Sequence, residues 1–350
     1  MMAPPALDAL LLVIGCLVTS AAFTVLALRY ARWHQLLDLP GQRRSHSAPT
    51  PRGGGIAIVL TLLLGMTLLD WPQPRVPLAL GVALLSVALV GWIDDHRPLS
   101  ARVRIVVHAL AALVLVGVWL PLAGAADTAL VLPFAALAVF WLVGCINAWN
   151  FIDGSNGLLA SQCLWLGLAL AWVLAGVEGE AALLARPLAG VSLALAGACA
   201  GFLPFNAPRA AIFLGDVGSG ALGLACGALL LAALVLAPGR AACLLILPSA
   251  ILVDAGLTLA WRVYTGRRWY TAHREHLYQW LVRSGCSHAS VALGYLAWNL
   301  FVVLPACAAA WRWPEAAPAI AGAVLLLAAV LWWQGKSMLR RRARIKGLIR

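Results

Sequence analysis

Two adjacent carboxylates, Asp94 and Asp95, end an apolar stretch of the chain and are followed by Arg97, Arg102 and Arg104. Adjacent acids in apolar surroundings are costly unless they are paired or bind a cation. Carboxylate oxygens are ligands for a divalent metal, and the arginines would add countercharge for phosphate groups. An ordinary helix end is the structural alternative, but the pattern favours a site for a metal ion and phosphates.

Polar side chains recur every third residue at Asn147, Asn150 and Asp153, and would form one stripe along a helix. Such a stripe binds a ligand or hydrogen-bonds a neighbouring helix. Asp216 follows Gly215 immediately before another apolar stretch. There it would bind a metal ion, cap the helix that begins beside it, or do both.

Two basic segments add candidate partners for phosphates and sugars. The first contains His46 and Arg52 and ends in three consecutive glycines, which let backbone N–H groups approach a ligand closely. A basic loop without a ligand is the alternative for this segment. The second contains His273, Arg274 and His276, whose imidazole and guanidinium groups can bind hydroxyl or phosphate oxygens.

Asp254 differs from the other candidates because it lies within an apolar stretch and not at its end. Acids inside a membrane span are functional candidates. A structural pair with Arg262, or with the asparagines that begin at Asn147, explains Asp254 equally well. The sequence leaves its role open.

The elements that position these residues are membrane-spanning helices. Of 350 residues, 63% are hydrophobic and 11% are charged, whereas soluble globular proteins are about 45–50% apolar and about 25% charged. We expect an all-α, polytopic integral membrane protein with about eleven transmembrane helices, or ten if one borderline segment is re-entrant. The expected spans are 8–28, 55–70, 77–93, 104–123, 128–146, 158–176, 187–204, 218–236, 241–261, 289–310 and 316–334.

Lys and Arg residues are concentrated in alternate loops and at the C-terminus. Because such residues are retained on the cytoplasmic side, we expect the N-terminus outside and the C-terminus inside, with the active-site loops in the cytoplasm. Topology and anionic lipid explain the net charge of +12 without nucleic acid. Neither a repeat nor a separate soluble domain is evident, so we expect a single transmembrane domain over 1–350 with a basic cytoplasmic tail over 335–350.

Together the polar segments resemble the polyprenyl-phosphate N-acetylhexosamine-1-phosphate transferases, the MraY- and WecA-like glycosyltransferase family 4. The resemblance covers roughly residues 38–288. Its most specific parts are Asn147-x-x-Asn150-Phe-x-Asp153-Gly and Phe205-Asn206 followed by Phe213-Leu-Gly-Asp216-Val-Gly-Ser. The segment from His273 to Gln279 is most similar to the O-antigen type of this family, whose donors are modified N-acetylhexosamines.

The resemblance implies transfer of a sugar 1-phosphate from a UDP-N-acetylhexosamine to undecaprenyl phosphate, with release of UMP. It implies Mg²⁺, with Mn²⁺ as an alternative, and a multi-pass enzyme of the bacterial inner membrane that begins O-antigen or other cell-envelope glycan synthesis. A homodimer is left open. The competing class is a multi-span transporter or lipid flippase. The Asp-Gly-x-x-Ala-Arg run of CDP-alcohol phosphotransferases is missing.

Motif positions and charge together assign the candidate site residues. Asp94 is expected to accept a proton from the acceptor phosphate, while Asp95 supports the metal or phosphate; a two-step route through a phosphorylated aspartate is left open. Asn156 replaces an acid of many relatives, so we expect no metal there. The catalytic candidates are Asp94, Asp95 and Asp216, the metal ligands Asp216 and Asp95, and the nucleotide-binding residues Asp153, Asn156, Phe213 and Asn150. Phosphate or sugar binding is expected of Asn206, His276, Arg274, His273, His46, Arg52, Arg102 and Arg104.

Overall fold

The computed structural model describes residues 6–38, 49–122, 131–268 and 273–345, and these are almost entirely helical. The α-helices are α1 Ala6–Trp33, α2 Ile56–Thr67, α3 Arg75–His96, α4 Ala101–Leu122, α5 Val131–Ile152, α6 Leu158–Ala175, α7 Ala182–Asn206, α8 Asp216–Leu236, α9 Ala241–Ile246, α10 Ser249–Tyr264, α11 Leu277–Arg283, α12 His288–Trp298, α13 Leu304–Arg312 and α14 Ala317–Ile345. A π-helical stretch, Asn299–Val303, joins α12 to α13. The two strands, β1 Leu37–Asp38 and β2 Thr50–Pro51, form a short antiparallel pair.

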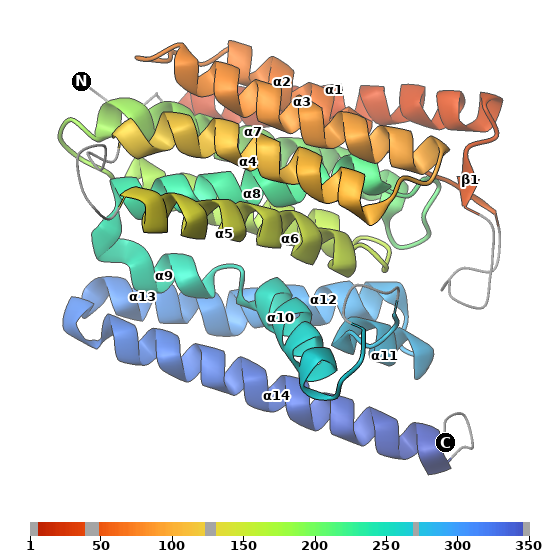
Figure 1. Cartoon of the computed structure of the whole chain (residues 1–350). Helices are drawn as coiled ribbons and strands as arrows, with labels where there is room; N and C mark the ends of the chain where they lie inside the picture. The colour runs from red at the N-terminus through yellow and green to blue at the C-terminus, as the bar shows by residue number, and fades with distance from the viewer. Residues whose placement is uncertain (1–5, 39–48, 123–130, 269–272, 346–350) are drawn as a thin grey trace.

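The helices lie side by side, with α1 to α8 in one group and α9, α12, α13 and α14 alongside it (Figure 1). Helix α8 occupies the centre of the first group and packs against α3, α5 and α6. Glycines of neighbouring segments allow this close packing: a methyl group at Gly55, just before α2, would overlap the Cα of Gly218, and one at Gly91 of α3 would overlap the carbonyl of Asp216. The start of α8 is therefore held at backbone contact with its neighbours.

Within the described residues, nine helices are long and apolar enough to cross a bilayer, and a tenth span is possible if a bent pair counts as one. The expected count of eleven exceeds this number, whereas the alternative count of ten lies within it, and the all-helical membrane architecture is confirmed. Helix α2 has only 12 residues and extends about 18 Å, short of the roughly 30 Å hydrocarbon core. The expected span 241–261 bends by 67° before α10, where Pro248 has no N–H to continue the helical ladder.

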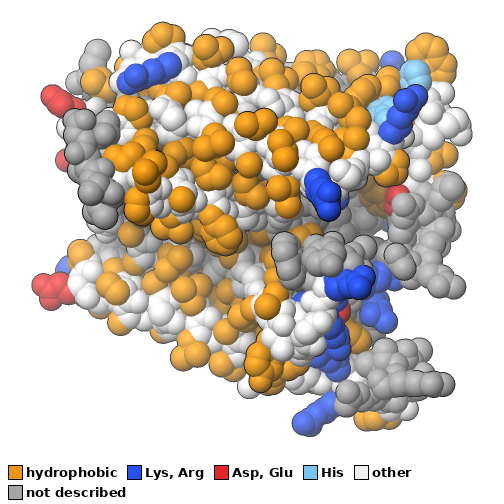
Figure 2. All heavy atoms as spheres, viewed as in Figure 1, with side chains coloured by type: hydrophobic (Ala, Val, Ile, Leu, Met, Phe, Trp, Pro, Cys, Tyr) orange, Lys and Arg blue, Asp and Glu red, His pale blue; other side chains and the backbone are white. Residues whose placement is uncertain are grey.

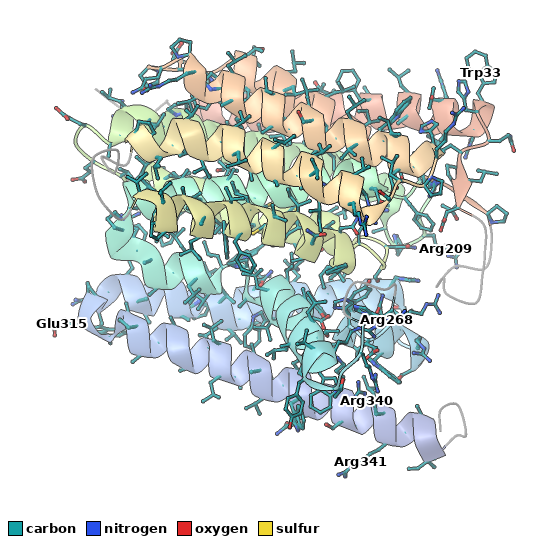
Figure 3. The ribbon with its side chains drawn as sticks, in the orientation of Figure 1. Trp33, Arg209, Arg268, Glu315, Arg340 and Arg341 are labelled. Carbon is teal, nitrogen blue, oxygen red and sulfur yellow. The ribbon has the colours of Figure 1, made fainter. Side chains whose placement is uncertain are left out.

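The two ends of the helix bundle differ in charge. Apolar side chains cover most of the face seen in Figure 2, and the labelled residues Arg209, Arg268 and Arg340 lie at one end in Figure 3. Glu315 lies at the opposite end. This polarity agrees with the charge pattern on which the N-out, C-in orientation rests, and the orientation itself stays a prediction.

The beginning of the predicted basic tail is part of the helical body. Helix α14 continues through Ile345, and within it Lys336 is only 3% exposed. The Lys336 ammonium lies 4.1 Å from the centroid of the Trp332 ring and donates to the Thr258 hydroxyl at 3.1 Å. The start of this segment, at Lys336 and Leu339, therefore packs against the bundle as well as carrying charge.

Candidate active site

A polar cavity of about 420 Å³ opens where the ends of α3, α5, α8 and α11 meet. It gathers residues from all five polar segments of the sequence. Its lining includes Asp38, Arg52, Asp95, Asp153, Asn156, Asn206, Phe213, Asp216, Arg274, Gln279 and Arg283. Asp38 was not predicted as a site residue: it is a single acid at the start of the basic first loop, with no second acid or spaced partner to mark it.

Asp94 and Asp216 are held by the same cation. One Nη atom of Arg104 lies 3.0 Å from Asp94 Oδ2 and 3.4 Å from Asp216 Oδ2. The backbone N–H of Leu99 also donates to Asp94, at 2.5 Å. The structure thus brings together two predicted catalytic acids and one predicted phosphate-binding arginine from α3, α4 and α8.

Asn150 reaches the same acid from the end of α5. Its amide nitrogen donates to Asp216 Oδ1 at 2.7 Å and to the Ser219 hydroxyl at 2.9 Å. The predicted polar stripe therefore delivers a side chain that orients Asp216. Asn147 instead donates to the carbonyl of Val143 within its own helix, at 2.7 Å.

Asp95 caps helix α8 from another helix. Its two carboxylate oxygens accept the backbone N–H groups of Asp216 and Val217, each at 3.2 Å, and its side chain is 3% exposed. Arg52 donates to the Asp95 carbonyl and holds its Nε 4.0 Å from Asp95 Oδ1. The cap alternative considered for Asp216 is wrong, because Asp216 is the first residue of α8 and Asp95 satisfies its N–H.

The turn before α8 needs glycine. Gly215 has φ of +77°, a conformation that L-residues with side chains rarely adopt. A Cβ at this position would also lie 2.5 Å from Asp95 Oδ2. Gly215 therefore allows α3 to approach α8 closely. It also leaves space for a ligand beside Asp216.

Asp153 follows α5 and lies half-buried in the cavity wall. Burial and the nearby carboxylates of Asp216 and Asp95 raise the pKa of Asp153 well above its ordinary value. Among the described residues, none forms an ion pair with it. A ligand that brings a hydrogen-bond donor or a cation would therefore find this carboxyl group unengaged.

Two asparagines brace the rim of the cavity. Asn206 accepts the Gly157 N–H at 2.7 Å and donates to the Ile212 carbonyl at 3.0 Å. Asn156 donates to the Pro208 carbonyl at 3.3 Å. Both side chains join the loop after α5 to the loop after α7, so their predicted ligand contacts would be made from a rigid frame.

The first loop positions Phe213 through backbone hydrogen bonds. The Phe213 N–H donates to the Pro51 carbonyl at 2.8 Å, and the Gly54 N–H donates to the Phe213 carbonyl at 2.9 Å. The next pair, Gly55 to Leu214, is also 2.8 Å. This pairing fixes the backbone on which the ring of Phe213 lines the cavity.

The two histidines of the fifth segment lie behind the cavity wall. His276 is 1% exposed and stacks on Phe151, with ring centroids 5.7 Å apart. His273 lies 5.0 Å from His276, and burial, with His276 and Arg262 nearby, lowers the pKa of His273 to about 4. Of this segment, Arg274 and Gln279 line the cavity.

Asp94, Arg104 and Asn150 are grouped around Asp216 but do not line the described cavity themselves. The remaining two predicted residues are Arg102 and His46. Arg102 is exposed on α4 and does not line the cavity. His46 lies outside the described residues.

Missed by the sequence reasoning is His288, whose Nδ1 contacts the Ser155 hydroxyl at 2.9 Å and accepts the Asn156 N–H at 3.4 Å. In the sequence, His288 is marked only by being a polar residue just before the expected span 289–310.

The carboxylates fit a Mg²⁺ site that substrate completes. In the described part of the chain, no three His, Cys, Asp or Glu side chains form a ready metal cage. Mg²⁺ is usually held by one or two carboxylates, with substrate phosphates and water supplying the other oxygens. Asp216 and Asp153 line the cavity and can supply such oxygens, whereas both oxygens of Asp95 already accept backbone N–H groups.

Comparison with known proteins identifies related sequences. The sequence profile of glycosyl transferase family 4 matches residues 77–234. A decaprenyl-phosphate N-acetylglucosaminephosphotransferase of Mycobacterium leprae is 32% identical over 87% of this chain and 83% of the relative. An undecaprenyl-phosphate alpha-N-acetylglucosaminyl 1-phosphate transferase of Thermotoga maritima is 33% identical over 55% of this chain and 56% of its own. A phospho-N-acetylmuramoyl-pentapeptide-transferase of Synechococcus is 34% identical over 58% of this chain and 60% of its own.

Proposed function

The chain belongs to glycosyl transferase family 4, and from this we propose that it transfers N-acetylglucosamine 1-phosphate from UDP-N-acetylglucosamine to a polyprenyl phosphate. The products are a polyprenyl-diphosphate-linked sugar and UMP, and the reaction begins the synthesis of a cell-envelope glycan. We place the active site on the cytoplasmic face of a bacterial inner membrane.

One observation carries the proposal. Asp94 and Asp216 come from helices far apart in the sequence, yet both contact Arg104 beside a cavity that Phe213 and Asp153 line. A donor with an aromatic base and a diphosphate has a counterpart for each of its parts in this cavity. A solute carrier would be expected to place its polar residues near the middle of the membrane, whereas these lie at helix ends.

The chemistry is phosphoryl transfer, in which positioning and charge neutralisation supply most of the catalysis. An oxygen of the polyprenyl phosphate attacks the sugar-linked phosphorus, the bond from that phosphorus to the bridging oxygen breaks, and UMP departs. A Mg²⁺ ion held by Asp216 and the diphosphate would offset the negative charge of the donor. Arg52 and Arg274 line the cavity and add fixed positive charge.

Asp94 and Asp95 take separate roles in this proposal. Arg104 and the Leu99 N–H orient Asp94, which we assign to accept a proton from the acceptor phosphate. Asp95 fixes the position of Asp216 by binding the first N–H groups of α8. Asp95 is thus placed as a positioning residue for the metal ligand.

We assign the nucleotide to the part of the cavity that Phe213, Asp153 and Asn156 line. Phe213 offers a ring face for uracil, and aromatic stacking of this kind contributes about 1–3 kcal/mol per base in single-stranded nucleic acid complexes. Asp153, protonated or ionised, can hydrogen-bond the uracil edge, and Asn156 lies beside it in the lining. Arg274, Gln279 and Arg283 are left for the sugar and diphosphate.

A panel of UDP-sugars tests the proposal. Purified protein, undecaprenyl phosphate and Mg²⁺ should release UMP and form lipid-linked product with UDP-N-acetylglucosamine. Turnover with only a 6-deoxy or otherwise modified N-acetylhexosamine would correct the donor and support the O-antigen type instead. Absence of lipid-linked product with every donor, together with solute or lipid movement in vesicles, would overturn the transferase in favour of a transporter.

A further inference from the structure

Asp254 ties four helices together within the second half of the bundle. The residue is 2% exposed, and its carboxylate accepts the N–H groups of Leu277 at 2.7 Å and Tyr278 at 3.3 Å, at the start of α11. It also accepts from the Tyr295 hydroxyl of α12 at 2.8 Å and the Trp332 indole of α14 at 3.1 Å. Asp254 itself belongs to α10.

Every one of these partners is a hydrogen-bond donor, so the site suits a side chain whose oxygens only accept. A fifth donor, the Thr258 hydroxyl, lies 3.4 Å from Asp254 Oδ1 and accepts in turn from Lys336. The buried ammonium of Lys336 supplies the opposite charge. Arg262, one partner expected for Asp254, pairs with Glu275.

The helix that Asp254 anchors separates two cavities. One side of α11 contributes Gln279, Val282 and Arg283 to the catalytic cavity. Leu277 and Leu281, one turn apart on the other side, line an apolar cavity of about 400 Å³ between α10, α12 and α14. A small rotation or shift of this seven-residue helix would move polar side chains relative to the bound donor.

A second contact links α11 to the turn after α5, which contains residues assigned to the nucleotide. The Tyr278 hydroxyl donates to the Phe151 carbonyl at 2.9 Å and accepts from Gln279 at 3.1 Å. A methyl group at Gly154 would overlap this hydroxyl oxygen. Asp153 lies in the turn between these two contacts.

We infer that Asp254 is a positioning residue for the donor: it anchors α11 so that Gln279 and Arg283 line the catalytic cavity and Tyr278 braces the turn that carries Asp153. The inference rests on the proposed function, since it assigns these side chains to a UDP-sugar. The carboxylate acts through α11 and touches no substrate.

Asp254→Asn tests the anchor, because the amide keeps the volume but presents an N–H₂ group where the carboxylate meets only donors. We expect the KM for UDP-N-acetylglucosamine to rise about tenfold, the usual effect of losing one charge-assisted hydrogen bond, with the KM for polyprenyl phosphate near wild type. Gln279→Ala should show a similar defect, and the double variant should be little worse than Gln279→Ala alone. Fully additive effects would overturn the inference.

Asn299→Leu is the matched control. Asn299 is also a fully buried polar residue of a span, and it hydrogen-bonds Gln162 at 2.8 Å, away from α11. This variant should change thermal stability and leave the donor KM unchanged. A rise in donor KM equal to that of Asp254→Asn would reduce Asp254 to a general structural role and overturn the inference.

Hydrogen exchange separates this inference from the proposed function. In Asp254→Asn the amides of Leu277 and Tyr278 should exchange faster than in wild type and in Asn299→Leu, whatever the protein catalyses; unchanged protection would overturn the anchor. Failure of wild type to turn over any UDP-sugar would overturn only the function. If Asp254→Asn does not fold, Tyr278→Phe must raise the donor KM, and a wild-type value there would count against the brace.

Discussion

At the scale of single residues, Asp95 and Asp216 are neighbours with different attachments. The Asp216 carboxylate contacts side chains, among them Asn150 and Arg104, and lines the cavity. Asp95 is bound by backbone N–H groups of α8 and is almost fully buried. Loss of the first therefore removes a ligand group, whereas loss of the second also removes a helix cap.

For Asp216→Asn we predict loss of turnover by about a hundred- to a thousandfold, the scale typical of removing a group that stabilises developing charge. The melting temperature should stay near wild type, because Asn can accept and donate in the same place. UMP release and thermal unfolding in detergent are the two measurements. Activity close to wild type would remove the metal assignment.

For Asp95→Ala we predict a lower free energy of unfolding, by about 1–2 kcal/mol for a lost helix cap, in addition to lost activity. The physical reason is that the N–H groups of Asp216 and Val217 would lose their acceptor. Thermal unfolding of Asp95→Ala beside Asp216→Asn separates the two roles. Equal melting temperatures in both variants would argue against the cap.

The raised pKa of Asp153 leads us to predict that the free energy of unfolding depends on pH. Because the fold raises its pKa above the ordinary value of 3.8, the folded state binds the proton more tightly than the unfolded state. This contribution to stability is full below that ordinary value and is lost as pH rises through the raised one. Asp153→Asn should therefore have a higher melting temperature than wild type at pH 8 without ligand, and a shallower decline from pH 5 to pH 8.

Asp70→Asn serves as the control for this titration, because Asp70 is an exposed acid in the loop between α2 and α3. Its pH profile should follow that of wild type. A wild-type profile in Asp153→Asn as well would show that Asp153 is not the group whose titration lowers stability.

At the scale of elements, the contact of α3 with α8 determines where the acids meet. A methyl group at Gly91 would overlap the backbone of Asp216, whereas one at Gly81 of the same helix would lie 3.7 Å from Leu63 Cδ2, an ordinary contact. We predict that Gly91→Ala separates the helices and lowers kcat about a hundredfold, since a misplacement of about 1 Å has effects of that size. Gly81→Ala should retain activity, and loss in both variants would point to a helix-wide effect.

The sequence predicted which side chains come together in the candidate site. It predicted less well which hydrogen bonds fix the helices that carry them. Asp94, Asp153 and Asp216 were identified by type, spacing and neighbouring glycines, and the motifs supplied Phe213. A cap on α8 was one of the alternatives left open for Asp216, its own first residue, because a helix start seen in isolation offers only local partners. Asp95 replaces it from 121 residues away, a contact that depends on helix packing and leaves no local pattern.

The fifth segment was the least predictable element for a similar reason. His273 and His276 have functional side chains, yet both pack behind the wall while Gln279 and Arg283 line the cavity. Which face of a short helix meets a cavity is decided by its anchors, here Asp254 and Tyr278. Spacing along the chain identified this segment as functional but did not predict which of its side chains face the cavity.

At the scale of the whole molecule, hydropathy predicted the fold class and all nine long spans found among the described residues, but not the geometry of the short or broken ones. It treats α2 and the α9–α10 pair as ordinary spans, because length below the bilayer thickness and a bend at Pro248 do not change apolar content. The orientation of the bundle is a prediction that accessible cysteines can test.

Cys286 is the one exposed cysteine of the eight, all of which lie in described residues. With the C-terminus inside, a membrane-impermeant maleimide should label Cys286 only after the cells are opened. Glu315→Cys in a Cys286→Ser background should be labelled in intact cells, because Glu315 is exposed at the opposite end of the bundle. The reverse pattern would invert the topology and move the cavity to the outer face.

The cap that Asp95 places on α8 has a consequence for how the protein is made. Its N–H partners lie 121 and 122 residues further along the chain, so at about 5–20 residues per second the ribosome needs roughly 6 to 24 s to supply them. During that interval α3 has entered the membrane with an acid whose partners do not yet exist. Two cations can offset the charge of this helix end before α8 is synthesised. They are Arg52, which is already synthesised, and Arg104, which follows Asp94 by 10 residues.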